Sequence, residues 1–151
     1  MKHLLTAVLT LSLLGVPLAV RADGVDELVE YGTRAAIDNE VDPYLVAHIW
    51  WFESSGNLNA IGAHGEIGPY QIKWTTWEHF CADLDMEPER ADLNDPAITS
   101  EVVAWALSTG YGRWWSTYTD EPQLPNWLES RIRAEQRRTD WSIEQAHWSS
   151  E

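Results

Sequence analysis

One glutamate stands where a helix should present its apolar face. Val46, Ile49, Trp50 and Glu53 are spaced at i, i+3, i+4 and i+7, so they share one side of a predicted helix. The apolar surroundings and the nearby negative end of the helix dipole both favour the protonated form of such a carboxyl group. A glutamic acid that keeps its proton can protonate the leaving oxygen of a glycosidic bond. The alternative is a glutamate at a frayed helix end that turns to water.

The remaining side chains that bind metals lack the spacing of a metal site. The histidines do not form an HExxH zinc motif. Acidic residues alternate over 83–89 like calcium ligands, but Pro88 stands where a calcium loop needs glycine. The single cysteine, Cys81, cannot form an internal disulfide, and we expect it to be buried. We therefore expect no metal ion and no cofactor.

Composition and charge limit the classes of protein to which this chain can belong. The chain has 151 residues, including 10 Trp, 5 Tyr and 2 Phe, which is enough for one domain with an aromatic core. Ten basic residues stand against 24 acidic ones, giving a net charge of −14. Such a charge repels polyanions, so we expect no nucleic-acid partner.

The first 22 residues have the features of a secretory signal peptide. Lys2 precedes an apolar run over residues 4–14, and Val20-Arg21-Ala22 has the small-residue pattern of a cleavage site. An uncleaved membrane anchor is the alternative, but the run is short and Pro17 interrupts it. We expect cleavage after Ala22, a periplasmic or secreted protein, and no stable membrane span in the mature chain.

Helical patterns occupy most of the remaining chain. Asp42-Pro43 and Asp95-Pro96 are helix-start signals, and a glycine-rich stretch over 56–68 predicts a loop or short irregular hairpin. The periodicity predicts helices over 25–37, 43–54, from about 75 to 84, from 96 towards 110, and 127–138. We expect a mainly α domain over 23–120, followed over 121–151 by a C-terminal helix and a tail whose last dozen residues are weakly ordered.

The C-terminal helix differs from the rest of the chain in charge. Residues 127–138 contain four arginines and two glutamates, whereas the preceding domain is strongly acidic. The helix could dock on the acidic body, or its charged face could simply be solvated.

Three motifs over residues 41–72 occur together. Val41-Asp42-Pro43 leads into the helix that ends at Glu53-Ser54, and a glycine-rich segment then closes with the run 68–72, Gly-Pro-Tyr-Gln-Ile. This arrangement resembles the soluble lytic transglycosylase family of lysozyme-like enzymes, with its Glu-Ser pair and its Gly-x-x-Gln-hydrophobic pattern. The resemblance extends over about residues 37–107 and is strongest over 41–72.

The resemblance implies a lysozyme-like helical fold with room for a small β-hairpin. It also implies cleavage of the MurNAc–GlcNAc β-1,4 bond of peptidoglycan without water, leaving a 1,6-anhydro-MurNAc end, with Glu53 as acid and then base. Ser54, Tyr70, Gln71 and Ile72 would belong to the substrate site, with Tyr70 as a stacking face and Gln71 as hydrogen-bond donor and acceptor. Peptidoglycan strands are the expected partner, with a secretion or conjugation apparatus as a further candidate.

The family's Ala-Tyr-Asn-Ala-Gly motif, whose tyrosine lies near the catalytic acid, is absent from this chain. The nearest substitute is the stretch 115–118, Trp-Ser-Thr-Tyr. It makes Tyr118 the candidate for the missing tyrosine, with Tyr111 as the alternative and a core role open for either.

Two other functions are compatible with the sequence. A hydrolytic lysozyme would need a second carboxylate, for which Glu66 is the candidate unless it is solvent-exposed. In goose-type lysozymes, which resemble this chain more distantly, an acid follows the Gln-hydrophobic pair, but here that position is Lys73. A sugar-binding or secretion-assembly module of the same fold is the third hypothesis, with Trp74, Trp114 and Trp115 as cleft candidates.

Overall fold

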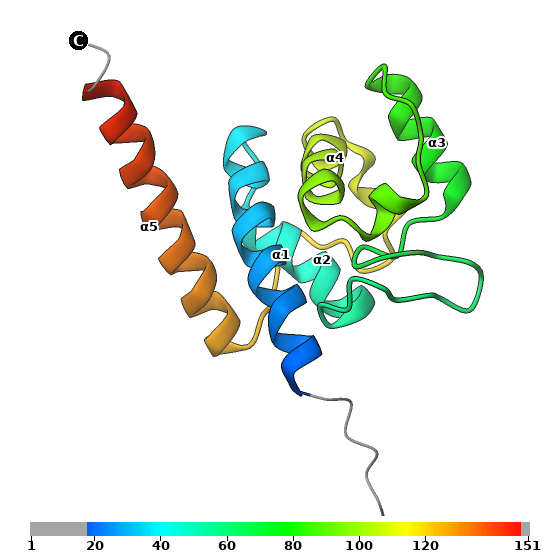
Figure 1. Ribbon diagram of the computed structural model, residues 1–151, viewed down its shortest axis with the longest axis horizontal. Coiled ribbons are helices and arrows are strands. Elements are labelled where there is room, and N and C mark those ends of the chain that lie inside the picture. Colours follow the sequence, from blue (N-terminus) through cyan, green and yellow to red (C-terminus); the bar gives the residue numbers. More distant parts are fainter. Residues whose placement is uncertain (1–17, 149–151) are drawn as a thin grey trace, which may run out of the picture.

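The computed structural model describes residues 18–148, with side chains described over 24–146. Helices dominate this part of the chain, and the glycine-rich segment forms a long loop at one side (Figure 1). In chain order the elements are α1 (Leu18–Asp38), α2 (Pro43–Ser54), α3 (Trp74–Asp83), the 3-10 helix η1 (Ala91–Asn94), α4 (Pro96–Ser108), the 3-10 helix η2 (Tyr111–Trp114) and α5 (Asn126–Trp148). The expected mainly α fold is confirmed.

The same Asp-Pro signal starts both α2 and α4. The Asp42 carboxylate accepts a hydrogen bond from the backbone N–H of Tyr44 at 2.9 Å. The Asp95 carboxylate accepts from the N–H groups of Ala97 at 2.8 Å and Ile98 at 3.1 Å. Each aspartate satisfies amide groups that have no partner within the helix, and the following proline occupies the first helical position. Both predicted starts are confirmed.

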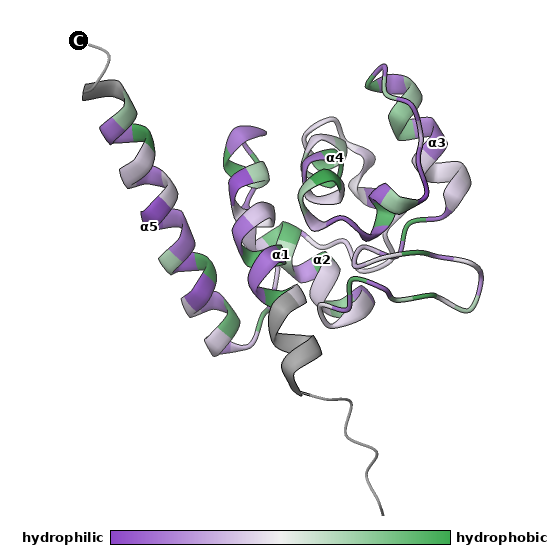
Figure 2. Ribbon diagram, in the orientation of Figure 1, coloured by the Kyte–Doolittle hydropathy of each residue, from purple (hydrophilic) through white to green (hydrophobic). Residues whose placement is uncertain are grey.

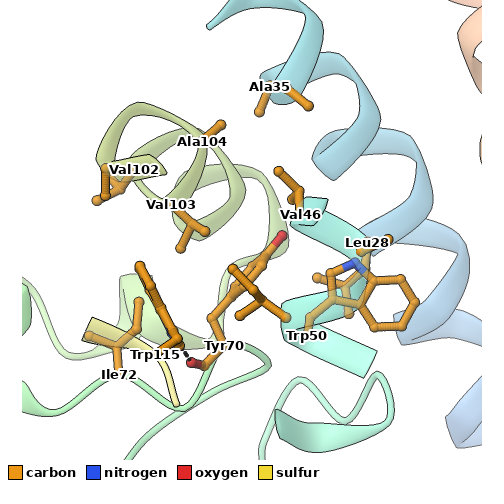
Figure 3. Packing of buried hydrophobic residues seen from close by; sticks show 14 of the residues in the cluster. Leu28, Ala35, Val46, Trp50, Tyr70, Ile72, Val102, Val103, Ala104 and Trp115 are labelled. Carbon is orange, nitrogen blue, oxygen red and sulfur yellow. Dashed lines mark hydrogen bonds between the residues drawn. The ribbon is translucent and has the colours of Figure 1, made fainter. Parts of the chain in front are cut away.

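Helix α1 lies at the centre of the fold and packs against α2, α4 and α5. The residues buried between these helices are mainly apolar, and Tyr70, Ile72 and Trp115 from outside the helices extend the same cluster (Figure 3). The largest fully buried members are Trp50, Trp77, Tyr70, Phe80, Leu28, Ile49 and Leu93. Cys81 belongs to this core as expected, and burial raises the pKa of its thiol.

The loop between α2 and α3 contains bridges but no strand in the described chain. Ile61 pairs with Ile67, and Ile67 pairs with Ile72, both antiparallel. This is the irregular hairpin that the glycines predicted. Gly68 has a φ of +77°, and a Cβ atom there would collide with the backbone carbonyl of Leu93. Gly68 therefore allows close packing against the segment before α4.

Helix α5 docks along α1 (Figure 1). Leu128, Ile132, Glu135 and Thr139 follow one another at helical spacing, and all four are buried. Arg131 forms an ion pair with Asp26 of α1. Many of the other residues of α5 are hydrophilic (Figure 2). The structure thus favours docking over a fully solvated helix.

The expectation of a weakly ordered tail is wrong for most of that segment. Helix α5 continues ten residues beyond the predicted end, to Trp148, while residues 149–151 lie outside the described part. The physical reason is that no glycine or proline interrupts residues 126–148.

The expected signal peptide lies largely outside the described residues. Residues 1–17 of the expected signal peptide are not described, and the cleavage expected after Ala22 lies in α1, before its first core residue, Val25. None of the described helices combines the length and the apolar character needed to cross a membrane.

Candidate active site

A cleft of about 290 Å³ lies where the end of α2 meets the glycine-rich loop, the start of α3 and the segment after η2. Its lining combines two carboxylates, a lysine, an amide and two indole rings. The lining residues are Glu53, Glu66, Gln71, Ile72, Lys73, Thr76, Trp114, Trp115 and Ser116. The structure therefore brings Glu53 and the Gln71 segment together, as the sequence predicted.

Glu53 lies in the last turn of α2, where it is half-buried. The hydroxyl of Thr117 donates a hydrogen bond to Oε1 of Glu53 at 2.8 Å. Within residues 24–146 this is the one hydrogen bond made by the Glu53 side chain. The carboxyl group is thus neither in open solvent nor sealed in the core, and it borders a space that a ligand can enter.

Gln71 is held by the loop that it closes. Its amide nitrogen donates to the backbone carbonyls of Gly68 at 2.8 Å and Ala60 at 3.3 Å. A Cβ atom on Gly62 would lie 2.6 Å from Oε1 of Gln71, so the absence of a side chain there makes room for the amide. Because both donors are engaged in the loop, the amide oxygen is the group left for a ligand.

Glu66 lines the same cleft, and its side chain is 20% exposed. One carboxylate oxygen accepts from the backbone N–H of His64 at 2.9 Å, and the other lies 3.6 Å from Nζ of Lys73. Backbone hydrogen bonds, with a smaller contribution from Lys73, lower the pKa of Glu66. Glu66 is therefore ionised at neutral pH, and its carboxylate already accepts a hydrogen bond from its own loop.

Two tryptophans border the cleft from the segment after α4. Trp114 is 50% exposed, and its ring stacks on His79 with ring centres 5.2 Å apart. Trp115 is almost fully buried, and its indole nitrogen donates to the carbonyl of Tyr70 at 2.9 Å. The third cleft candidate, Trp74, lies beneath the guanidinium of Arg90 and is not part of the lining. Trp114 is the aromatic surface that a sugar ring could reach.

Tyr70 does not offer the stacking face that the sequence analysis expected. Its side chain is fully buried, and its hydroxyl shares a hydrogen bond of 2.8 Å with Ser100 of α4. Burial also raises the pKa of its phenol. Tyr70 therefore belongs to the core, and its backbone carbonyl anchors Trp115.

Ser54 also has a structural role in place of the expected substrate contact. Its hydroxyl donates to the carbonyl of Trp50 at 3.1 Å and accepts from the N–H of Gly56 at 3.2 Å. These bonds hold the end of α2 and the turn that follows it. Ile72 does line the cleft, but its side chain is 2% exposed, so it contributes mainly to the floor beneath the site.

Neither candidate tyrosine donates its hydroxyl to Glu53. The Tyr118 hydroxyl donates to Asp120 at 3.1 Å, and this residue lines a neighbouring hollow that excludes Glu53. The Tyr111 hydroxyl donates to Asp83 at 3.0 Å, and its ring packs against Phe80 and Trp105. The residue of this stretch that donates to Glu53 is Thr117, which no sequence pattern singled out.

The described side chains contain no group of three or more His, Cys, Asp or Glu residues placed to hold a metal ion. The cleft itself offers carboxyl groups for acid–base chemistry, with polar side chains and an exposed indole ring that can hold a ligand.

Comparison with known protein families shows a match that spans the cleft. Residues 30–121 match the family model described as Transglycosylase SLT domain, which covers most of the chain from α1 to the segment before α5. The match includes every residue that lines the cleft. No curated protein matches the chain.

Proposed function

This chain belongs to the transglycosylase SLT domain family, and from that membership we propose that it cleaves the MurNAc–GlcNAc β-1,4 bond of peptidoglycan without water. The observation that carries the proposal is the position of Glu53. It is a half-buried carboxyl group on a cleft that also holds Gln71 and an exposed tryptophan face. A single acid placed in this way can perform both proton transfers of the reaction.

In the first step, protonated Glu53 donates its proton to the glycosidic oxygen, and the bond from that oxygen to C1 of MurNAc breaks. The GlcNAc side leaves as an alcohol, and positive charge develops at C1 and the ring oxygen of MurNAc. In the second step, the Glu53 carboxylate takes the proton from the C6 hydroxyl of the same MurNAc, and O6 bonds to C1. Glu53 is protonated again, and the product is a 1,6-anhydro end.

The surrounding groups can hold the strand during both steps. Trp114 offers an exposed ring for stacking on a sugar, and the free amide oxygen of Gln71 can accept from a hydroxyl or an N-acetyl N–H. The chain has a net charge of −14, so binding should depend on these short-range contacts more than on attraction to the cell wall.

A hydrolytic lysozyme mechanism is the second candidate, because ionised Glu66 lines the same cleft as Glu53. Such an enzyme needs a second carboxylate that activates water or stabilises the sugar cation. Both oxygens of Glu66 already face partners within the protein, His64 N–H and Lys73. This engagement supports the single-acid mechanism over the hydrolytic one.

We also propose a periplasmic or secreted location. The support is the signal-peptide pattern of residues 1–22, together with a substrate that lies outside the cytoplasm.

The test is solubilisation of purified peptidoglycan by the wild type, Glu53→Gln and Glu78→Gln. Glu78 is an exposed glutamate of α3 away from the cleft, so its variant makes the same chemical change elsewhere. We expect Glu53→Gln to lose roughly three or more orders of magnitude in rate, since it removes the only proton donor of the mechanism, and Glu78→Gln to retain its activity. If Glu53→Gln solubilises peptidoglycan as fast as the wild type, the enzymatic proposal is wrong.

A further inference from the structure

We propose that Thr117 is a positioning residue for Glu53, one that assigns a separate task to each carboxyl oxygen. The inference rests on the proposed function, because it concerns the proton transfers of that reaction. Thr117 holds Oε1, and Oε2 carries the proton to and from the substrate.

The contact itself joins two distant parts of the chain. Thr117 and Glu53 are 64 residues apart in sequence, and Thr117 Oγ1 lies 2.8 Å from Glu53 Oε1. Both side chains are half-buried, so water competes with this bond less than it would on an open surface. In the part of the chain that the structure describes, Oε2 has no hydrogen-bond partner.

A hydroxyl group suits a residue that changes its protonation state twice in each cycle. When the proton is on Oε2, Oε1 keeps its lone pairs, so the hydroxyl can donate to Oε1 in the acid as well as in the carboxylate. Thr117 can therefore keep Oε1 in place while Glu53 is an acid in the first step and a base in the second. An ammonium group in this place would instead favour the ionised carboxylate through its charge.

The backbone around Thr117 is fixed by its neighbours. The buried Trp115 ring donates from its indole nitrogen to the carbonyl of Tyr70 at 2.9 Å. The N–H of Trp115 donates to Gly112, and the N–H of Tyr118 donates to Trp115. Thr117 thus lies in a turn anchored to the core, so its hydroxyl is held near Glu53 before substrate binds.

The decisive variants are Thr117→Val, which keeps the side-chain shape without the hydroxyl, and Thr117→Ser, which keeps the hydroxyl. Loss of a hydrogen bond to a charged group should lower kcat roughly ten- to a hundredfold. KM should change by less than about threefold, since the contact is to the enzyme's own acid and not to the substrate. Thr117→Ser should recover most of kcat. Thr75→Val, at an exposed threonine of α3 outside the cleft, is the matched control.

A second readout does not depend on turnover. The 13C resonance of the Glu53 carboxyl group, assigned by its loss in Glu53→Gln, should shift in Thr117→Val and return in Thr117→Ser. If the wild type yields no anhydro product, the proposed function fails, while the resonance still reports on the contact. The inference is overturned if Thr117→Val leaves kcat and the resonance as in the wild type. It is also overturned if Thr117→Ser is as impaired as Thr117→Val, because the effect would then be structural.

Discussion

The indole nitrogen of Trp115 donates a hydrogen bond of 2.9 Å to the backbone carbonyl of Tyr70 (Figure 3). This bond joins the segment after η2, which carries Thr117, to the loop that carries Gln71. Both segments border the Glu53 cleft. One buried hydrogen bond therefore ties together two segments that border the cleft.

Replacing Trp115 with Phe should destabilise the protein and loosen this connection. The variant removes a buried donor and leaves the Tyr70 carbonyl without its partner, which costs about 1–3 kcal/mol. Urea unfolding measures the change, and Trp127→Phe, at a 47% exposed tryptophan of α5, serves as control. A Trp115→Phe protein as stable as the wild type would show that the bond contributes little.

Glu66→Gln should retain most of the lytic activity, within about fivefold of the wild type. The reason is that the single-acid mechanism gives Glu66 no proton to transfer, although its neutralisation alters the charge of the cleft wall. A hydrolytic mechanism with Glu66 as second carboxylate predicts instead a loss of roughly two or more orders of magnitude. Initial rates on purified peptidoglycan separate the two outcomes.

Trp114→Ala should weaken substrate binding more than it slows the chemical step. Its half-exposed ring is the aromatic surface of the cleft, and a stacking contact of about 1 kcal/mol corresponds to roughly a fivefold rise in KM. Trp141→Ala, at a 63% exposed tryptophan near the end of α5, should leave KM unchanged. Equal KM values for the wild type and Trp114→Ala would argue against sugar stacking at this ring.

The docked half of α5 should contribute to stability, whereas its exposed end should not. Ile132 is fully buried against the body, so Ile132→Ala should cost about 2–5 kcal/mol. Ile143 is 54% exposed on the same helix, and Ile143→Ala should change stability by less than about 0.5 kcal/mol. Thermal unfolding compares the two directly. Deletion of residues 127–151 without any loss of stability would contradict docking.

The sequence alone predicted the features that depend on residues close together in the chain. The starts of α2 and α4 follow from Asp-Pro pairs, because capping and a fixed proline φ act within one helical turn. Helical spacing placed Glu53 on the apolar side of α2 but left open that it turns to water, and the resemblance over residues 41–72 favoured a site. Cys81 lies in the core, as the sequence analysis expected of an unpaired cysteine.

The errors concern positions that tertiary contacts decide. Tyr70 precedes Gln71, whose φ of +49° is left-handed, and this tight turn buries the tyrosine ring against α4 while Gln71 borders the cleft. No local pattern distinguishes the two orientations. Thr117 reaches Glu53 across 64 residues of sequence, so its role could only be read from the folded chain. Within the stretch 115–118 that supplied the candidate Tyr118, the structure gives Glu53 a hydrogen bond from Thr117 and pairs the Tyr118 hydroxyl with Asp120.

The central claim is that one carboxyl group cleaves the glycan strand without water, and the mass of the products tests it most directly. Purified peptidoglycan digested by the wild type should give fragments that end in 1,6-anhydro-MurNAc, each lighter by one water than the corresponding hydrolysis product. Fragments that carry ordinary reducing MurNAc ends would contradict the account and favour the hydrolytic mechanism with Glu66.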